Sequence, residues 1–110
     1  MKTFPVRKLS RDEGGEYVLG LKDLNTHACY LIYGELDAGE GDRKICPGAG
    51  HEEILLAATG ELEVSGELFN GRLPEGEAIH LREEETCFIA NPGNSRVIYV
   101  LAGGHSGADH

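Results

Sequence analysis

Tryptophan is absent from this 110-residue chain, and no apolar stretch approaches the roughly 20 residues that a membrane-spanning helix needs. The amino-terminal residues also lack the run of about 7–15 apolar residues found in a signal peptide. Basic residues are few: ten lysines and arginines stand against 19 aspartates and glutamates, and the formal net charge is −9. This charge would repel a phosphate backbone or an anionic lipid surface. We therefore expect no nucleic-acid partner, no membrane partner and a cytoplasmic location.

Cysteine is sparse as well. Cys29, Cys46 and Cys87 form an odd set that does not fit the framework of a disulfide-stapled secreted domain. We expect free thiols, or one thiol with a special role. The remaining composition, 40% hydrophobic and 26% charged, is that of an ordinary globular protein. The length suffices for one hydrophobic core but not for two.

Glycine, in contrast, is abundant. Sixteen glycines separate short segments that contain β-branched and aromatic residues, which is typical of a β meander or barrel. Strands are predicted over residues 16–21, 27–36, 52–59, 60–64, 77–81, 86–90 and 95–102, with weaker candidates at 4–8 and 43–46. Turn residues at 37–41, 46–50, 69–71, 73–76 and 91–94 favour hairpins between these strands. The sequence thus predicts an all-β, mostly antiparallel fold without long helices.

Residues 1–102 are predicted to form a single domain, and the small polar residues 103–110 to form a flexible tail. Two of the predicted strands, around residues 54–58 and 97–102, are apolar on both faces, which indicates burial on both sides. One side would face the core, and the other a second sheet or a partner subunit. We therefore expect a homodimer, although two packed sheets within one chain would explain the pattern equally well.

Two segments have spacings that indicate a particular family. The first contains Gly41, Pro47, Ala49, Glu53 and Gly60. The second contains Gly76, Arg82, Glu84, Cys87 and Asn91. Their glycines, glutamate and final asparagine are spaced as in the two motifs of the cupin superfamily, which this chain resembles over residues 41–91. The resemblance implies a cupin-like double-stranded β-helix, that is, a jelly-roll barrel of mostly antiparallel strands.

In cupins, two histidines and the glutamate of the first motif and a histidine of the second motif bind one divalent metal inside the barrel. In this chain those four positions are Pro47, Ala49, Glu53 and Cys87, so only the carboxylate is retained. The metal-binding motif is therefore degenerate. We expect a small single-domain cupin-like protein that lacks the usual metal centre and has no cofactor.

A substitute metal site is the alternative. His51 lies two residues before Glu53, and in a strand both side chains would point to the same face. Cys87 would approach from the second motif, and its thiolate is a competent ligand for zinc, with iron and nickel as the other candidate metals. Against this reading, a cysteine in the apolar segment 86–90 is most often a small buried hydrophobe, and His51 would then be a solvated turn residue.

Two further polar residues are candidates for the interior. Glu53 without a metal needs a hydrogen-bonding partner or protonation, because burying a bare carboxylate is costly. His80 alternates with Ala78 and would face the cavity if Glu77, Ile79 and Leu81 take the other side. Strand parity does not say which face is inward, and a partly buried surface histidine is an equal alternative. Asn91, at a predicted turn, is expected to satisfy backbone groups locally.

These observations leave three functions open. The preferred one is a small-molecule-binding or regulatory domain with His51, Glu53, His80 and Cys87 as ligand-binding candidates. The second is a metal-dependent enzyme of the isomerase, oxygenase or lyase type, with His51, Glu53 and Cys87 on the metal and His80 as acid or base. The third is a structural role in assembly, with the cavity filled by side chains. A shared fold does not distinguish among these three functions.

Overall fold

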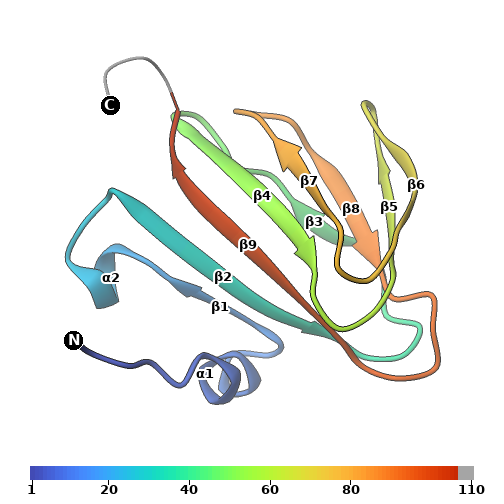
Figure 1. Cartoon of the computed structure of the whole chain (residues 1–110), viewed down its shortest axis with the longest axis horizontal. Coiled ribbons are helices and arrows are strands. Elements are labelled where there is room, and N and C mark those ends of the chain that lie inside the picture. The colour runs from blue at the N-terminus through green and yellow to red at the C-terminus, as the bar shows by residue number, and fades with distance from the viewer. Residues whose placement is uncertain (107–110) are drawn as a thin grey trace.

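Two antiparallel sheets make up most of this computed structural model, which describes residues 1–106 (Figure 1). The five-stranded sheet has the order β1 (Glu16–Leu19), β2 (Cys29–Leu36), β9 (Val97–His105), β4 (His51–Ala57) and β7 (Ala78–Leu81). The four-stranded sheet has the order β3 (Arg43–Ile45), β8 (Cys87–Ala90), β5 (Leu62–Gly66) and β6 (Asn70–Leu73). The predicted all-β, mostly antiparallel fold is confirmed. Within the described residues the sheets form an open sandwich and do not close into a barrel.

Alternation along each strand separates an inner face, toward the other sheet, from an outer face. On β9, Val97, Tyr99 and Leu101 are at most 5% exposed, whereas Ile98 and Val100 between them are half-buried. Full burial of an aliphatic side chain stabilises the fold by about 1.5–3 kcal/mol. Both sheets supply the rest of this core: Leu36, Ile45, Leu55, Ala57, Leu62, Val64, Leu73, Leu81, Cys87 and Ile89.

The amino-terminal segment is helical. The strand predicted at residues 4–8 is wrong, because this segment enters α1 (Val6–Asp12). Val6 and Leu9 are spaced for one side of a helix, and α1 packs against β1 and β2. The strand predicted over 16–21 ends at Leu19, because a second short helix, α2 (Leu21–Leu24), follows it. No helix within residues 1–106 is long and apolar enough to cross a membrane.

Two short strands in the four-stranded sheet bear on the predictions. The weak candidate at 43–46 is confirmed as β3, which pairs with β8. The structure adds β6, which begins inside the turn predicted at residues 69–71 and pairs with β5 from Ser65↔Asn70 to Leu62↔Leu73. Turn residues such as Asn70 and Gly71 disfavour a strand, but the ladder with β5 overrides that local preference.

The carboxyl-terminal boundary also needs correction. The domain was predicted to end at residue 102, but β9 continues to His105 and pairs with strands on both sides, as in Tyr30↔Gly103 and Glu53↔Gly103. Glycine has a low strand propensity, yet at position 103 it is the residue that leaves room for the Tyr30 ring, which an added Cβ would overlap. The last part of the predicted flexible tail, residues 107–110, lies outside the described residues.

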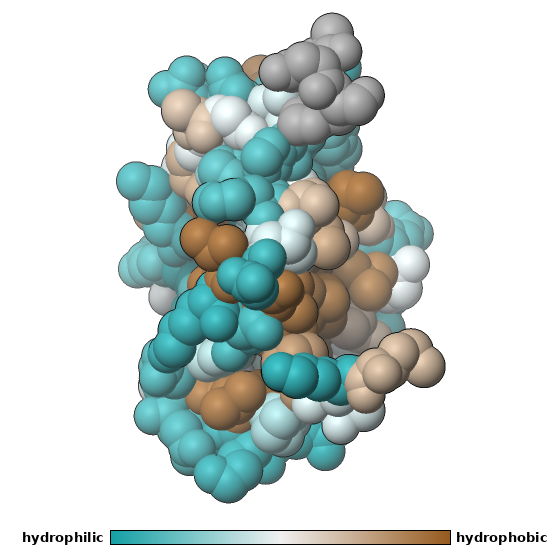
Figure 2. Space-filling model, turned by 90° about the vertical axis from the view of Figure 1, so that its left-hand side faces the viewer, coloured by the Kyte–Doolittle hydropathy of each residue, from teal (hydrophilic) through white to brown (hydrophobic). Residues whose placement is uncertain are grey.

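The outer face of the five-stranded sheet is apolar along β4 and β9. It carries Ile54, which is 49% exposed, and the half-buried Leu56, Ile98 and Val100. The helix α1 lies over β1 and β2 instead, where Arg11 forms a salt bridge with Glu35. Figure 2 shows hydrophobic residues gathered around the middle of one side of the molecule, with hydrophilic residues around them. The second apolar face predicted from the sequence is therefore present and is not covered by the other sheet.

Candidate functional site

Two of the motif residues, Pro47 and Glu53, line one cavity, and the others lie elsewhere. Glu53 lies on the inner face of β4 and is 4% exposed. Pro47, the residue at the first histidine position, lines the same cavity as Glu53. Ala49, at the second histidine position, is in an exposed turn and does not line that cavity.

Tyr30 is the partner of the buried Glu53 carboxylate. Its phenol donates a hydrogen bond of 2.6 Å to Glu53 Oε2. Burial of the phenol, and then the hydrogen bond to Glu53, raise the pKa of Tyr30, so the hydroxyl stays a donor near neutral pH. The sequence predicted that Glu53 needs such a partner, and the partner proves to be a side chain of the protein itself. Sequence reasoning missed Tyr30, because its position opposite Glu53 depends on both strands pairing with Gly103.

A cavity of about 290 Å³ opens beside this pair. His51 is on the inner face of β4 with Glu53, and its ring centroid lies 5.7 Å from that of Tyr30 in an edge-on arrangement. His51 Nδ1 is 3.1 Å from the Ala49 carbonyl oxygen. The cavity is lined by Val18, Gly20, Leu21, Thr26, His27, Cys29, Tyr30, Pro47, His51 and Glu53.

One oxygen of Glu53 remains free to accept a ligand. No residue of the described chain donates a hydrogen bond to Oε1, whereas Oε2 is held by Tyr30. No buried side-chain oxygen or nitrogen lacks a partner among residues 1–106, so Oε1 is accessible from the cavity. The cavity therefore presents a strong hydrogen-bond acceptor that is fixed in place by a second buried side chain.

Cys87 lies on the inner face of β8 and is 4% exposed. Burial, together with the neighbouring Cys46 and Glu53, raises the pKa of its thiol to about 11. The thiol is therefore protonated near neutral pH and is not a reactive thiolate. Cys87 does not line the cavity of His51 and Glu53; it lines a second, larger cleft.

His80 does not point between the sheets. Its register partner is Ile54 on the outer face of β4, while Ile79 and Leu81 take the inner face. His80 Nε2 lies 2.7 Å from Glu52 Oε1, and both side chains are substantially exposed. Of the two orientations that strand parity leaves open, the structure has the outward one, so His80 does not face the interior. His80 is consequently a residue at the rim of the larger cleft.

The residues around Glu53 do not fit a cupin metal. No group of three or more histidine, cysteine, aspartate or glutamate side chains within residues 1–106 is arranged to hold an ion. Glu53 shares one oxygen with Tyr30, and the residues at the two histidine positions carry no donor side chain. The alternative set of His51, Glu53 and Cys87 is divided between two cavities.

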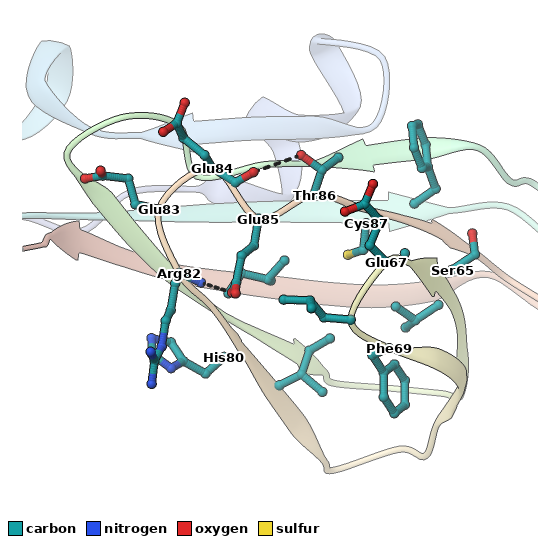
Figure 3. A pocket seen from close by; sticks show the side chains of 16 residues that line it. Ser65, Glu67, Phe69, His80, Arg82, Glu83, Glu84, Glu85, Thr86 and Cys87 are labelled. Atoms are coloured by element: carbon teal, nitrogen blue, oxygen red, sulfur yellow. Dashed lines mark hydrogen bonds between the residues drawn. The ribbon is translucent and has the colours of Figure 1, made fainter.

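The larger cleft measures about 920 Å³ and lies between the β5–β6 hairpin and the connection from β7 to β8 (Figure 3). Its lining residues are Val64–Phe69 and Ile79–Phe88. Leu68 and Phe69, at the hairpin tip, are 75% and 40% exposed. Sequence reasoning did not identify this cleft, because the hairpin tip resembles an ordinary turn when its distance from β7 is unknown.

Asn91, at the last position of the second motif, has a structural role. Its side-chain nitrogen donates to the carbonyls of Leu36, Asp37 and Ser95 at 2.7–3.1 Å, and its oxygen accepts from Gly93 N at 2.9 Å. The residue is 2% exposed. The expectation of local backbone contacts is confirmed for Ser95 and Gly93. The contacts with Leu36 and Asp37 are long-range, and they join the end of β2 to the end of β8 and the start of β9.

Comparison with known proteins gives similarity of structure only. No family model and no curated protein sequence matches the chain. A cupin protein from Bacteroides fragilis superposes with a TM-score of 0.73 at 14% identity, over 100% of this chain and 86% of that one. A Klebsiella pneumoniae protein with a double-stranded β-helix domain gives 0.71 at 18% identity, over 98% and 93%.

Enzymes are among the similar structures too. Oxalate oxidase superposes with a TM-score of 0.67 at 21% identity, over 83% of this chain. The chain spans only about half the length of that enzyme, as it does for another of the structures it matches. Identities this low establish the fold and not the activity. The two-sheet architecture and these superpositions agree with the motif spacing, and the chain therefore has the fold of the cupin superfamily.

Proposed function

We propose that this chain is a small-molecule-binding cupin-like domain that works without a metal, with its ligand in the cavity beside Glu53. The observation that carries the proposal is the free Oε1 of a buried carboxylate whose other oxygen is held by Tyr30. A hydroxyl or amine of a small ligand would complete its hydrogen bonding and offset the cost of burying the charge. The histidine rings of His27 and His51 supply further polar and aromatic wall.

The volume of the cavity limits the ligand. About 290 Å³ is at the lower end of the range for small-molecule sites, so the ligand is a small metabolite and not a polymer segment. A metal-dependent activity like that of oxalate oxidase is not favoured, because the donor side chains are absent from the positions that would hold the ion.

Two measurements test the proposal. Elemental analysis of protein purified without chelator should give less than about a tenth of an equivalent of any transition metal. Thermal-shift screening against small hydroxylated and amino metabolites should give stabilising ligands, with a gain of about 2.7 kcal/mol when the ligand is present at 100 times its dissociation constant. Glu53→Gln keeps an acceptor for Tyr30 but removes the charge, and should weaken binding about tenfold or more.

The matched control is Glu52→Gln, because Glu52 is the neighbouring glutamate on the outer face of the same strand. That variant should bind ligands like the unmutated protein. A stoichiometric metal that is lost in both Glu53→Ala and Cys87→Ser would overturn the proposal in favour of a metal enzyme. So would a complete screen in which no compound distinguishes Glu53→Gln from Glu52→Gln.

A further inference from the structure

The larger cleft has an apolar wall and an acidic rim. Ile79 and Leu81 of β7 and Val64 of β5 belong to the lining, and the hairpin tip extends it with the exposed Leu68 and Phe69. Apolar side chains as exposed as Leu68 leave uncompensated apolar surface in water. The cleft shares none of its lining residues with the cavity beside Glu53, so the two are separate sites.

Negative charge predominates in this lining. It contains four glutamates, Glu67, Glu83, Glu84 and Glu85, against the single arginine Arg82. Figure 3 shows Arg82 and His80 together at one end of the cleft, Phe69 and Glu67 at the other end on the β5–β6 hairpin, and Glu85 between the two ends.

The glutamates differ in how far their oxygens are already used. Glu83 Oε2 accepts hydrogen bonds from Gly50 N and from Ser106 Oγ, which fix that side chain at the rim. Glu85 accepts one hydrogen bond, from the backbone nitrogen of Arg82 at 2.6 Å through Oε1. For Glu67 and Glu84 the described residues supply no hydrogen-bond donor to the side chain. Arg82 has no salt bridge within residues 1–106, so the acidic rim is not neutralised by it there.

We propose that this cleft binds an amphipathic cation, namely an ammonium or guanidinium group carried on an apolar body. The cation would lie at the acidic rim, to which Glu67 and Glu85 belong, and the apolar body would cover Ile79 and Phe69. Charge complementarity selects this class, because the rim repels an anion, and a neutral apolar ligand would gain nothing from the carboxylates. The volume of about 920 Å³ accommodates a ligand of drug-like size.

The test compares three probes that share one apolar body. Isothermal titration calorimetry is run with phenylbutylamine, phenylbutanol and 5-phenylpentanoate, which carry a cationic, a neutral and an anionic group on the same phenylbutyl chain. The amine should bind about tenfold more tightly than the alcohol at low ionic strength, and the acid should bind more weakly than either. Added salt should reduce the advantage of the amine and leave the alcohol unchanged.

Variants locate the site. The double variant Glu67→Gln/Glu85→Gln keeps the acceptor for Arg82 N, and should lower the affinity for the amine to that for the alcohol. Glu75→Gln, in the turn before β7 and outside the lining, should behave like the unmutated protein. Phe69→Ser should weaken the amine and the alcohol by a similar factor.

Equal binding of amine and alcohol would overturn the proposal, as would an amine preference that survives the Glu67→Gln/Glu85→Gln change. Failure here is distinguishable from failure of the function proposed for the Glu53 cavity. Glu53→Gln should leave phenylbutylamine binding unchanged, and the two rim substitutions should leave the metabolite binding of the Glu53 cavity unchanged.

Discussion

Tyr30 compensates the burial of the Glu53 carboxylate inside the sandwich. The carboxylate is at the position where cupins bind a metal, but in this chain a phenol hydroxyl compensates its burial. Removing one partner of a buried hydrogen bond leaves the other unsatisfied at a cost of about 1–3 kcal/mol, more for a charged group. The two side chains therefore stabilise the fold and shape the cavity at the same time.

The buried thiol of Cys87 makes stability depend on pH in the alkaline range. Its pKa is about 11 in the folded protein and 9.0 in the reference state. Below pH 9 both states keep the proton and the full stability is present. Between pH 9 and 11 the unfolded state loses the proton first, so the free energy of unfolding falls as the pH rises. Cys87 should contribute a decrease of about 2–3 kcal/mol over this window.

The measurement is urea denaturation of the unmutated protein and of Cys87→Ala from pH 8 to 11, because subtraction cancels the tyrosines that both proteins share. A thiol reagent provides the control. It should label the exposed Cys29 and Cys46 in the native protein, and Cys87 only after denaturant is added. A difference between the two proteins that is independent of pH, or native labelling of three thiols, would contradict the assignment.

At the scale of elements, tyrosine packs on glycine across the β2–β9 strand pair. Tyr30 lies over Gly103, and Tyr99 lies over Gly34. In both pairs the glycine is the register partner of the tyrosine on the neighbouring strand. An added methyl group at either glycine would overlap the ring. Such pairs allow a large aromatic side chain to lie across the sheet and bury the surface of a residue that has no side chain.

Gly103→Ala should destabilise the protein by about 1–3 kcal/mol, because the ring of Tyr30 must move away from its present position. The backbone there does not require glycine, since Gly103 is not among the residues with positive φ. The loss should shrink markedly in a Tyr30→Ala background, which denaturation of the four proteins of this double-mutant cycle would measure. Equal losses with and without Tyr30 would show that the ring is not the cause.

The elements also show how far sequence reasoning reaches in this protein. Strand alternation and motif spacing predicted that Glu53 and Cys87 face the interior, and both are 4% exposed, but the two side chains line different cavities. Local pattern failed at Val6, where Phe4-Pro5-Val6 alternates like a strand but continues as a helix with Leu9. It left His80 open because parity gives two faces without saying which is inward. Tyr30 and the larger cleft depend on contacts between distant segments, which no local pattern contains.

For the whole molecule, net charge and the uncovered apolar face act in opposite directions on self-association. Each chain carries a formal charge of −9, so two copies repel each other. The outer face of β4 and β9, however, is apolar, with Ile54, Leu56, Ile98 and Val100 half-buried or exposed. Pairing this face with that of a second copy would remove it from water without bringing charges together at its centre. The homodimer predicted from the sequence stays a prediction, and this face is where we expect it to form.

Light scattering after size exclusion should give twice the monomer mass. Added salt should stabilise the dimer, so that it dissociates only at lower protein concentration, because salt screens the repulsion between the chains. Ile54→Lys places a charge on the outer face and should yield a monomer with an unchanged circular dichroism spectrum. Val18→Lys is the matched control, because Val18 is equally exposed, at 53%, but lines the cavity beside Glu53 on the opposite face of the sheet. That variant should remain dimeric. If the unmutated protein is monomeric at every concentration and salt level, the homodimer prediction is wrong. If both substitutions dissociate the dimer alike, the outer face of β4 and β9 is not the interface.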